Sequence, residues 1–199
     1  GLYDSFPNKV MQSAQLLPES IDKNEYPNRL DYTSKLCFTI DGEDTRDIDD
    51  AISIELNEKG NRVLGVHIAD VGEYVKKDNV FDKEAFKRGT SVYFPNLVLP
   101  MLPRELSNGI CSLNERVDRL ALSCFMEFDK SGNVIDHKIC ESIINSKKRF
   151  TYTKVQEIFD GSKDEQPELI DALLLMRGLA KQLADNRVSR GAIEFNIPE

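Results

Sequence analysis

The stretch DGEDTRDIDD, residues 41–50, places six acidic residues and one arginine between two apolar segments. The apolar run at 36–40 predicts a short buried strand, and the alternation of apolar and polar side chains at 51–56 predicts a half-buried strand. Two carboxylates about 4 Å apart repel by roughly 1 kcal/mol in water, and by more when partly buried. Because strands hold both ends of this turn near a sheet end, we expect it to need a counter-cation. The alternative is a solvated charged loop whose side chains splay apart.

The residue types in this turn favour a hard divalent cation. Carboxylate oxygens without cysteine or histidine favour Mg²⁺ or Mn²⁺ over zinc. A calcium-binding EF-hand loop does not fit, because Ala51 follows Asp50 and the required glycine is missing. A phosphatase with an aspartate nucleophile is a sharper alternative, since Asp47-Ile48-Asp49 after a strand resembles its D-x-D core. That match is incomplete, because Ala51 stands where such phosphatases prefer threonine or valine.

The remaining periodicity predicts an α+β fold with a mostly antiparallel mixed sheet and packed helices. Further strands are predicted at residues 63–69, 119–128 and 134–144. Helices are predicted near residues 8–17, at 78–88 with Phe81, Ala85 and Phe86 on one side, and along the stripe formed by Leu169, Leu173, Met176, Ala180 and Leu183. Residues 90–103 are rich in proline and are expected to be extended. We divide the chain into a lead-in segment, 1–35, and a domain portion, 36–199.

Net charge, apolar runs and the number of cysteines and histidines exclude several classes of protein. The 199 residues are 40% hydrophobic, and a net charge of −8 argues against a surface that attracts nucleic acid everywhere. No apolar run approaches the roughly 20 residues that cross a bilayer, so no membrane partner is expected. Four scattered cysteines and two distant histidines indicate neither a zinc site nor a disulfide framework, which favours a cytoplasmic location. The glycine at the start and the abrupt end suggest a fragment.

Residues 39–51 as a whole closely resemble the signature of the RNB-type exoribonucleases, the ribonuclease II and ribonuclease R type. The Gly-Glu-Asp form at 42–44 looks like the bacterial ribonuclease R branch. The resemblance continues in the same order through the motifs HIADV (67–71), YFP (93–95), LPMLPRELS (99–107) and CSL (111–113). It runs from about residue 3 to residue 199, whereas the catalytic domain of that family continues further. The resemblance thus implies the N-terminal portion of an RNB catalytic domain.

The resemblance implies a magnesium-dependent hydrolytic enzyme that degrades single-stranded RNA from its 3′ end to nucleoside 5′-monophosphates. Carried over to this sequence, it makes Asp41 and Asp50 magnesium ligands, with Asp47 assisting directly or through water. Asp49 resembles the essential catalytic carboxylate. Manganese is expected to substitute for magnesium.

The same resemblance implies RNA-stacking rings. Tyr93 and Phe195 resemble a pair that clamps the last stacked bases, and Tyr152 resembles the tyrosine beside the terminal nucleotide. A base stacked on such a ring contributes about 1–3 kcal/mol and ignores sequence. Flanking cold-shock and S1 domains are expected in a full-length protein. A later glutamate and arginine of the family site have no counterpart here, so an RNA- or metal-binding module without turnover remains the alternative.

Several other polar residues belong to the matching motifs or lie close to them. We expect His67 to be a hydrogen-bonded strand histidine and Asp70 to be structural. Arg104 and Glu105 are expected to brace a loop. The basic triplet at 147–149 is interpreted either as a phosphate contact or as a solvated surface.

Overall fold

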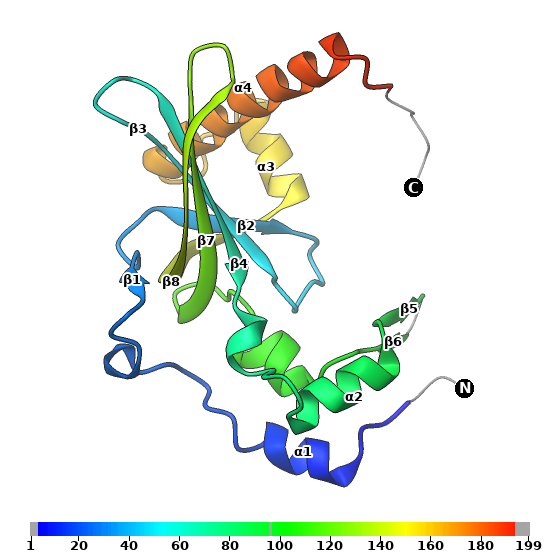
Figure 1. Cartoon of the computed structure of the whole chain (residues 1–199). Helices are drawn as coiled ribbons and strands as arrows, with labels where there is room; N and C mark the ends of the chain where they lie inside the picture. Colours follow the sequence, from blue (N-terminus) through cyan, green and yellow to red (C-terminus); the bar gives the residue numbers. More distant parts are fainter. Residues whose placement is uncertain (1–3, 96, 194–199) are drawn as a thin grey trace.

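The computed structural model describes residues 4–95 and 97–193, and its centre is a strongly curved mixed sheet (Figure 1). The six strands, in the order in which they pair, are β1 (Leu30–Asp31), β8 (Val134–Thr151), β2 (Cys37–Asp41), β3 (Asp50–Leu56), β4 (Arg62–Ala69) and β7 (Asp118–Phe128). β7 also pairs with β8, which closes the sheet on itself. Most pairings are antiparallel, and β8 runs parallel to β1 and β2. The predicted α+β class with a mostly antiparallel mixed sheet is confirmed.

The alternation of side chains along β3 explains how the sheet separates two cores. Successive residues of a strand point to opposite faces. Ile52 and Ile54 therefore face the cluster that contains Phe38 and Phe150, while Ala51 belongs to a second cluster on the other face. The strand thus supplies apolar surface to both sides, which fixes its register with β4.

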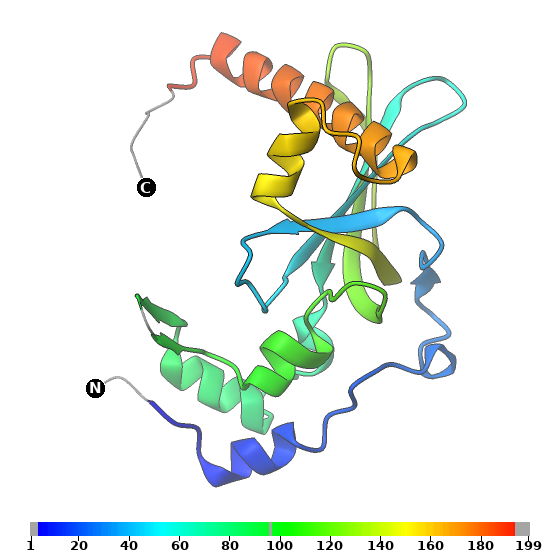
Figure 2. The same cartoon turned by 180° about the vertical axis from the view of Figure 1, so that it is seen from behind.

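Two helices cover the outer face of the sheet, as both views show (Figures 1 and 2). They are α3 (Tyr152–Phe159) and α4 (Pro167–Ser189). The predicted apolar stripe of α4 is confirmed at Leu169 and Leu173, which are buried. It is wrong at Ala180, which is exposed, and the neighbouring Leu179 is buried instead. α3 was not predicted, and it begins where the Thr151 side chain accepts a hydrogen bond from the Lys154 amide at 3.1 Å.

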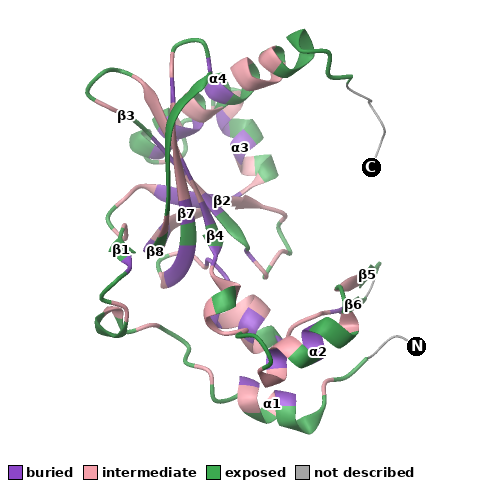
Figure 3. Cartoon of the chain, viewed as in Figure 1, coloured by how far each residue is buried: buried purple, intermediate pink, exposed green. Residues whose placement is uncertain are grey.

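A second lobe lies beside the sheet and has its own small core. It contains α1 (Asn8–Ala14), η2 (Val71–Glu73), α2 (Val80–Arg88), the hairpin of β5 (Val92–Phe94) with β6 (Leu97–Leu99), and a π-helix, η3 (Glu105–Ile110). Val10, Phe81 and Leu106 pack together at its centre. Phe86 was predicted to share the buried side of α2, and this is wrong, because it is 90% exposed. Figure 3 shows that the β5–β6 hairpin has mostly exposed or half-buried residues.

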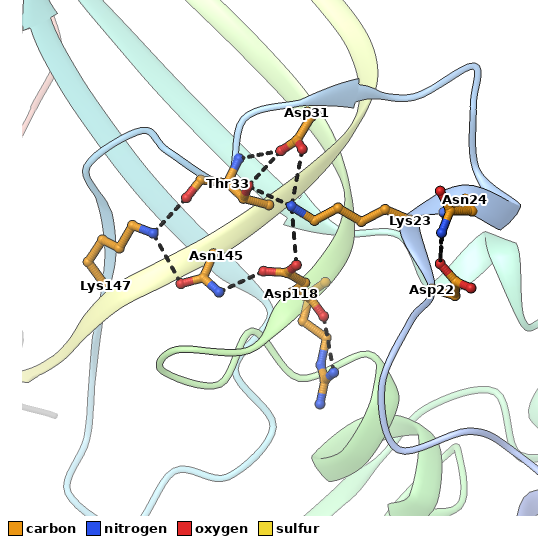
Figure 4. Close-up of polar contacts among 9 residues, drawn as sticks. Asp22, Lys23, Asn24, Asp31, Thr33, Asp118, Asn145 and Lys147 are labelled. Carbon is orange, nitrogen blue, oxygen red and sulfur yellow. Dashed lines mark hydrogen bonds and ion pairs between the residues drawn. The ribbon is translucent and has the colours of Figure 1, made fainter.

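The segment before β2 is attached to the sheet by ion pairs as well as by β1. Lys23 is the first residue of the short 3-10 helix η1 (Lys23–Glu25), and its ammonium lies 3.1 Å from a carboxylate oxygen of Asp31 and 3.3 Å from one of Asp118 (Figure 4). The Arg29 guanidinium lies 2.6 Å from Asp70 at the end of β4. Hydrogen bonds from Thr33, with the Lys23 ammonium also contributing, lower the pKa of Asp31 to about 2. Residues 23–31 are therefore joined to β4 and β7.

Candidate active site

One buried isoleucine holds the acidic loop between β2 and β3 in place. Ile48 is 1% exposed and packs in the cluster that contains Ala51 and Leu113. Its amide donates to the Ser112 hydroxyl at 3.1 Å, and its carbonyl accepts from the Leu113 amide at 2.9 Å. The Ser112 hydroxyl in turn donates to the carbonyl of Arg46 at 2.8 Å. Ile48 is buried in the core, whereas the neighbouring Asp47 and Asp49 are half-buried and exposed, respectively.

Strand pairing brings the predicted carboxylates to one edge of the sheet. β2 ends at Asp41, and its antiparallel neighbour β3 begins at Asp50. The carbonyl of Asp49 accepts a hydrogen bond from the Ala69 amide at 2.8 Å, at the end of β4. Both views show the loop extending from this edge toward the lobe that carries β5 and β6 (Figures 1 and 2). The structure therefore gathers Asp41, Asp47, Asp49 and Asp50 in one region.

The carboxylates in this region influence one another electrostatically. Burial raises the pKa of Asp41, the nearby Thr39 hydroxyl and the Arg149 charge oppose this rise, and the charges of Asp50 and Asp47 add to it. Asp49 is open to solvent on one side, yet the surrounding protein removes part of its hydration. This desolvation raises the pKa of Asp49, and the charges of Asp47, Asp50 and Asp41 raise it further. A cation bound here would relieve this repulsion.

The fit of a metal ion can be judged from the donor atoms. Oδ2 of Asp41 is buried and has no hydrogen-bond partner among the described residues, so it is available as a ligand. Hard carboxylate oxygens suit Mg²⁺ and Mn²⁺. Across residues 4–95 and 97–193, however, no group of three or more aspartate, glutamate, histidine or cysteine side chains is arranged to hold a metal. Metal binding by Asp41, Asp47 and Asp50 therefore stays a prediction.

A cleft of about 710 Å³ lies between the acidic loop and the second lobe. Asp47 and Asp49 line one side, and Tyr93 and Arg104 line the other. Tyr93 is 67% exposed, and its hydroxyl lies 3.5 Å from Oδ2 of Asp47, at the limit of a hydrogen bond. Loss of hydration and the Asp47 charge raise the pKa of Tyr93. An aromatic ring and two carboxylates thus share one open cleft.

The other two predicted RNA-binding rings have different positions. Tyr152 is 67% exposed and is the first residue of α3, directly after Thr151, which pairs with Asp41. It therefore lies beyond the acidic edge and does not line the cleft with Tyr93. Phe195 lies outside the described residues.

The other polar residues singled out in the sequence are mostly structural. As predicted, His67 is a hydrogen-bonded strand histidine, with its ring 3.0 Å from the Ser53 hydroxyl and 2.7 Å from the Ser123 hydroxyl, and it is also fully buried. Asp70 pairs with Arg29, which agrees with the structural role predicted for it. Arg104 lines the cleft and has no ion pair with a described residue, so the structure shows no loop that it braces.

The basic triplet is engaged within the fold. Lys147 donates to the Thr33 carbonyl at 2.6 Å, and Lys148 pairs with Glu165 at 2.9 Å. Arg149 donates to the carbonyls of Gly42 and Glu43, each at 2.9 Å, which braces the start of the acidic loop. Neither proposed role of the triplet anticipated these contacts.

Sequence reasoning also missed the anchoring role of Ile48 and Ser112. Both lie within motifs that carry the family resemblance, and that placement is the one signal for them in the sequence. Their function is to fix the loop that presents the carboxylates, and not to contact a substrate.

The fold and the acidic edge together define an RNB domain, and residues 29–199 match that family. The chain belongs to the RNB-domain family, as the sequence motifs indicated. It is 44% identical over 201 residues to ribonuclease R 1 of Lactococcus lactis, covering 100% of this chain and 25% of that protein. It is 47% identical over 190 residues to ribonuclease R of Thermotoga maritima, covering 94% of this chain and 27% of that protein.

A solved structure of a ribonuclease R has the same three-dimensional arrangement as this chain. Mycoplasma genitalium RNase R, in complex with ribose-methylated single-stranded RNA, matches with a TM-score of 0.92 and 32% identity. The match covers 100% of this chain and 31% of that chain. This chain therefore spans about a quarter to a third of the proteins that it resembles. No helix among its described residues combines the length and apolar character that a membrane-spanning segment requires.

Proposed function

We propose that this chain supplies the acidic part of the active site of a hydrolytic, magnesium-dependent exoribonuclease. The substrate is single-stranded RNA, degraded from the 3′ end to nucleoside 5′-monophosphates. The observation that carries the proposal is the anchored loop that gathers four aspartates at one edge of the sheet, in a chain of the RNB family. The similar ribonuclease R proteins, one of them bound to single-stranded RNA, support the same reaction class.

Each aspartate has a proposed role that follows from its position. Asp41, Asp47 and Asp50 would hold the magnesium ion, and the unpartnered Oδ2 of Asp41 is the best-prepared donor. A bound magnesium ion would lower the pKa of a coordinated water and offset charge on the phosphodiester. Asp49 is the catalytic carboxylate, because it faces the cleft and its raised pKa suits proton exchange with a reacting group.

The aromatic residues grip the strand without selecting a sequence. Tyr93 offers an exposed ring in the cleft, and its approach to Asp47 places the ring beside the carboxylates. Tyr152, which is exposed next to the end of β2, would contact the terminal nucleotide. Phe195 is retained from the family pattern alone. Cold-shock and S1 domains on either side would deliver RNA to this cleft in a longer protein.

Two alternatives were open from the sequence: a phosphatase with an aspartate nucleophile, and an RNA- or metal-binding module without turnover. The phosphatase hypothesis required Asp47 and Asp49 directly after a strand, but β2 ends at Asp41 and the two residues lie at the far end of the loop. An RNA-binding module without turnover is distinguished by experiment, because it would bind RNA and leave it intact.

The test is Asp49→Asn, assayed with 5′-labelled single-stranded RNA and Mg²⁺ in this chain and in a chain extended to the length of its relatives. Removing the catalytic carboxylate is expected to lower cleavage at least about 1000-fold and to change RNA affinity less than about twofold. Glu43→Gln, in the same loop but outside the cleft, is the control. An equal loss of binding and cleavage would contradict the role of Asp49, and binding without cleavage by the extended wild-type chain would favour the module.

A further inference from the structure

We propose that Arg104 is a positioning residue that binds a non-scissile backbone phosphate of the RNA strand. This inference rests on the proposed function and concerns the wall of the cleft opposite the aspartates. Arg104 is exposed, and its side chain lines the cleft together with Asp47 and Asp49. Its charge is available, because it forms no ion pair or hydrogen bond with any side chain in the described parts of the chain.

The backbone around Arg104 is rigid, so its side chain is presented from a fixed point. Pro103 and Leu106, on either side, are buried, and Leu106 is 0% exposed in the core of the second lobe. The amides of Leu106 and Ser107 donate to the Pro103 carbonyl at 2.9 and 3.1 Å. Arg104 therefore precedes the π-helix η3 as an exposed residue between two anchors.

The charges in the cleft are arranged in a way that a phosphodiester strand would complement. Arg104 stands in the same cleft as Asp47 and Asp49, and Arg46 of the acidic loop lines it too, yet no arginine–carboxylate pair among these residues comes within 4 Å. Cation and carboxylates thus stay apart, although pairing would be favourable in isolation. A strand that offers one phosphate to the aspartate edge and another to Arg104 would use both. The planar guanidinium suits bidentate contact with a phosphate.

The wall that holds Arg104 also has apolar and aromatic surface for the rest of the nucleotide. Tyr93, Val98 and Met101 line the same side of the cleft. Bases and sugars can contact this surface while the phosphates face the arginine, which is the combination that single-stranded nucleic acid requires. Because the overall charge is −8, attraction of the phosphates depends on local cations, and Arg104 supplies one on this wall of the cleft.

The first test measures binding of 5′-fluorescein-labelled oligoadenylate RNA by anisotropy in EDTA, so that neither a divalent ion nor cleavage contributes. Arg104→Gln is expected to weaken binding about tenfold and to reduce the slope of log affinity against log salt by about 0.7, the value for one phosphate contact on a single strand. Lys59→Gln is the control, because Lys59 lies in the turn between β3 and β4, at the opposite end of those strands from the acidic loop. It should bind within twofold of the wild type.

The second test locates the contact. A set of RNAs is prepared, each with one phosphate replaced by a neutral methylphosphonate at a different linkage. At one linkage away from the 3′-terminal bond, this replacement should weaken RNA binding by the wild type but not by Arg104→Gln. Arg104→Lys keeps the charge and should retain the wild-type salt slope, which guards against an effect of misfolding. Equal RNA binding by Arg104→Gln and Lys59→Gln would overturn the inference. So would a result in which the loss of affinity from Arg104→Gln adds to the loss from the methylphosphonate at every linkage. The measurements are made in the chain extended to the length of its relatives, and failure of that wild type to bind RNA would instead overturn the proposed function together with the inference.

Discussion

Two polar clusters on the same sheet differ in how completely their atoms are satisfied. Inside the closed sheet, His67 lies between the hydroxyls of Ser53 and Ser123, and Ser123 contacts the Ser142 hydroxyl at 2.6 Å. Every one of these polar atoms has a partner. At the edge of the sheet, the buried Oδ2 of Asp41 has none among the described residues. A satisfied buried network stabilises a fold, whereas an unsatisfied and mutually repelling cluster costs stability and indicates a place for a ligand.

The hydrogen bonds of the interior network also determine the tautomer of His67. The Ser142 hydroxyl donates to the carbonyl of Ala121 at 3.1 Å, so its oxygen is free to accept from Ser123. Ser123 then accepts from Nδ1 of His67, and Nε2 accepts from Ser53. We infer a neutral imidazole with its proton on Nδ1. Burial, with the charge of Lys35 contributing, lowers the pKa of His67 to about 4, in agreement with this state.

Breaking the interior network should have the largest effect on stability. His67→Leu would leave the Ser53 hydroxyl without its partner in a buried site, and we expect a loss of about 3 kcal/mol in the free energy of unfolding at neutral pH. Urea denaturation followed by circular dichroism measures it. His137→Leu, at an exposed position of β8, is the control and should stay within about 0.5 kcal/mol of the wild type. Equal effects of the two changes would show that the network contributes nothing.

The same network predicts a pH dependence with a definite sign. Because the folded chain lowers the pKa of His67 from 6.5 to about 4, the unfolded chain binds more protons between these values. The stability contributed by neutral His67 is complete above about pH 6.5 and is lost as the pH falls toward 4, by up to about 3 kcal/mol. The difference in unfolding free energy between wild type and His67→Leu should therefore shrink over this range. A constant difference would contradict the neutral, buried state.

Disturbing the close packing around this network at Gly65 should have a smaller effect on stability. A methyl group at Gly65 would overlap the Ser53 hydroxyl and lie 3.0 Å from Nε2 of His67. We expect Gly65→Ala to lower the melting temperature, corresponding to a loss of about 2 kcal/mol. Gly178→Ala is the matched control, because Gly178 lies within α4 with open space around it. It should raise stability by about 0.5–1 kcal/mol, and a similar loss at both sites would refute the packing argument.

The smallest expected change in stability is at the acidic edge, and there the substitution should stabilise the chain. Asp41→Asn removes one of the repelling charges and is expected to stabilise the chain in EDTA by less than about 1 kcal/mol, since the half-buried site is partly screened by solvent. In the wild type, adding Mn²⁺ should raise the melting temperature, and the variant should lose most of that increase. Differential scanning calorimetry measures both. A destabilised variant in EDTA would mean that Asp41 is structural.

Much of this architecture could be predicted from local patterns. Period-two alternation located β3, the turn that follows it located β4, and the crowding of carboxylates between apolar strands located the candidate site. The resemblance of several ordered motifs identified the family. These signals are short-range, because each depends on neighbouring residues along the chain.

Tertiary structure alone decided how the strands close and which polar residues are free. The pairing of Asp41 with Thr151 joins positions far apart in the sequence, and no local pattern encodes it. That closure extends β8 through the basic triplet and engages Lys147 and Arg149 with backbone carbonyls, although their sequence resembles an exposed surface. It also leaves Arg104 exposed in the cleft. The sequence by itself therefore determined the family and the place of the candidate site, and long-range packing determined which side chains are available there, because availability depends on neighbours that only the folded chain provides.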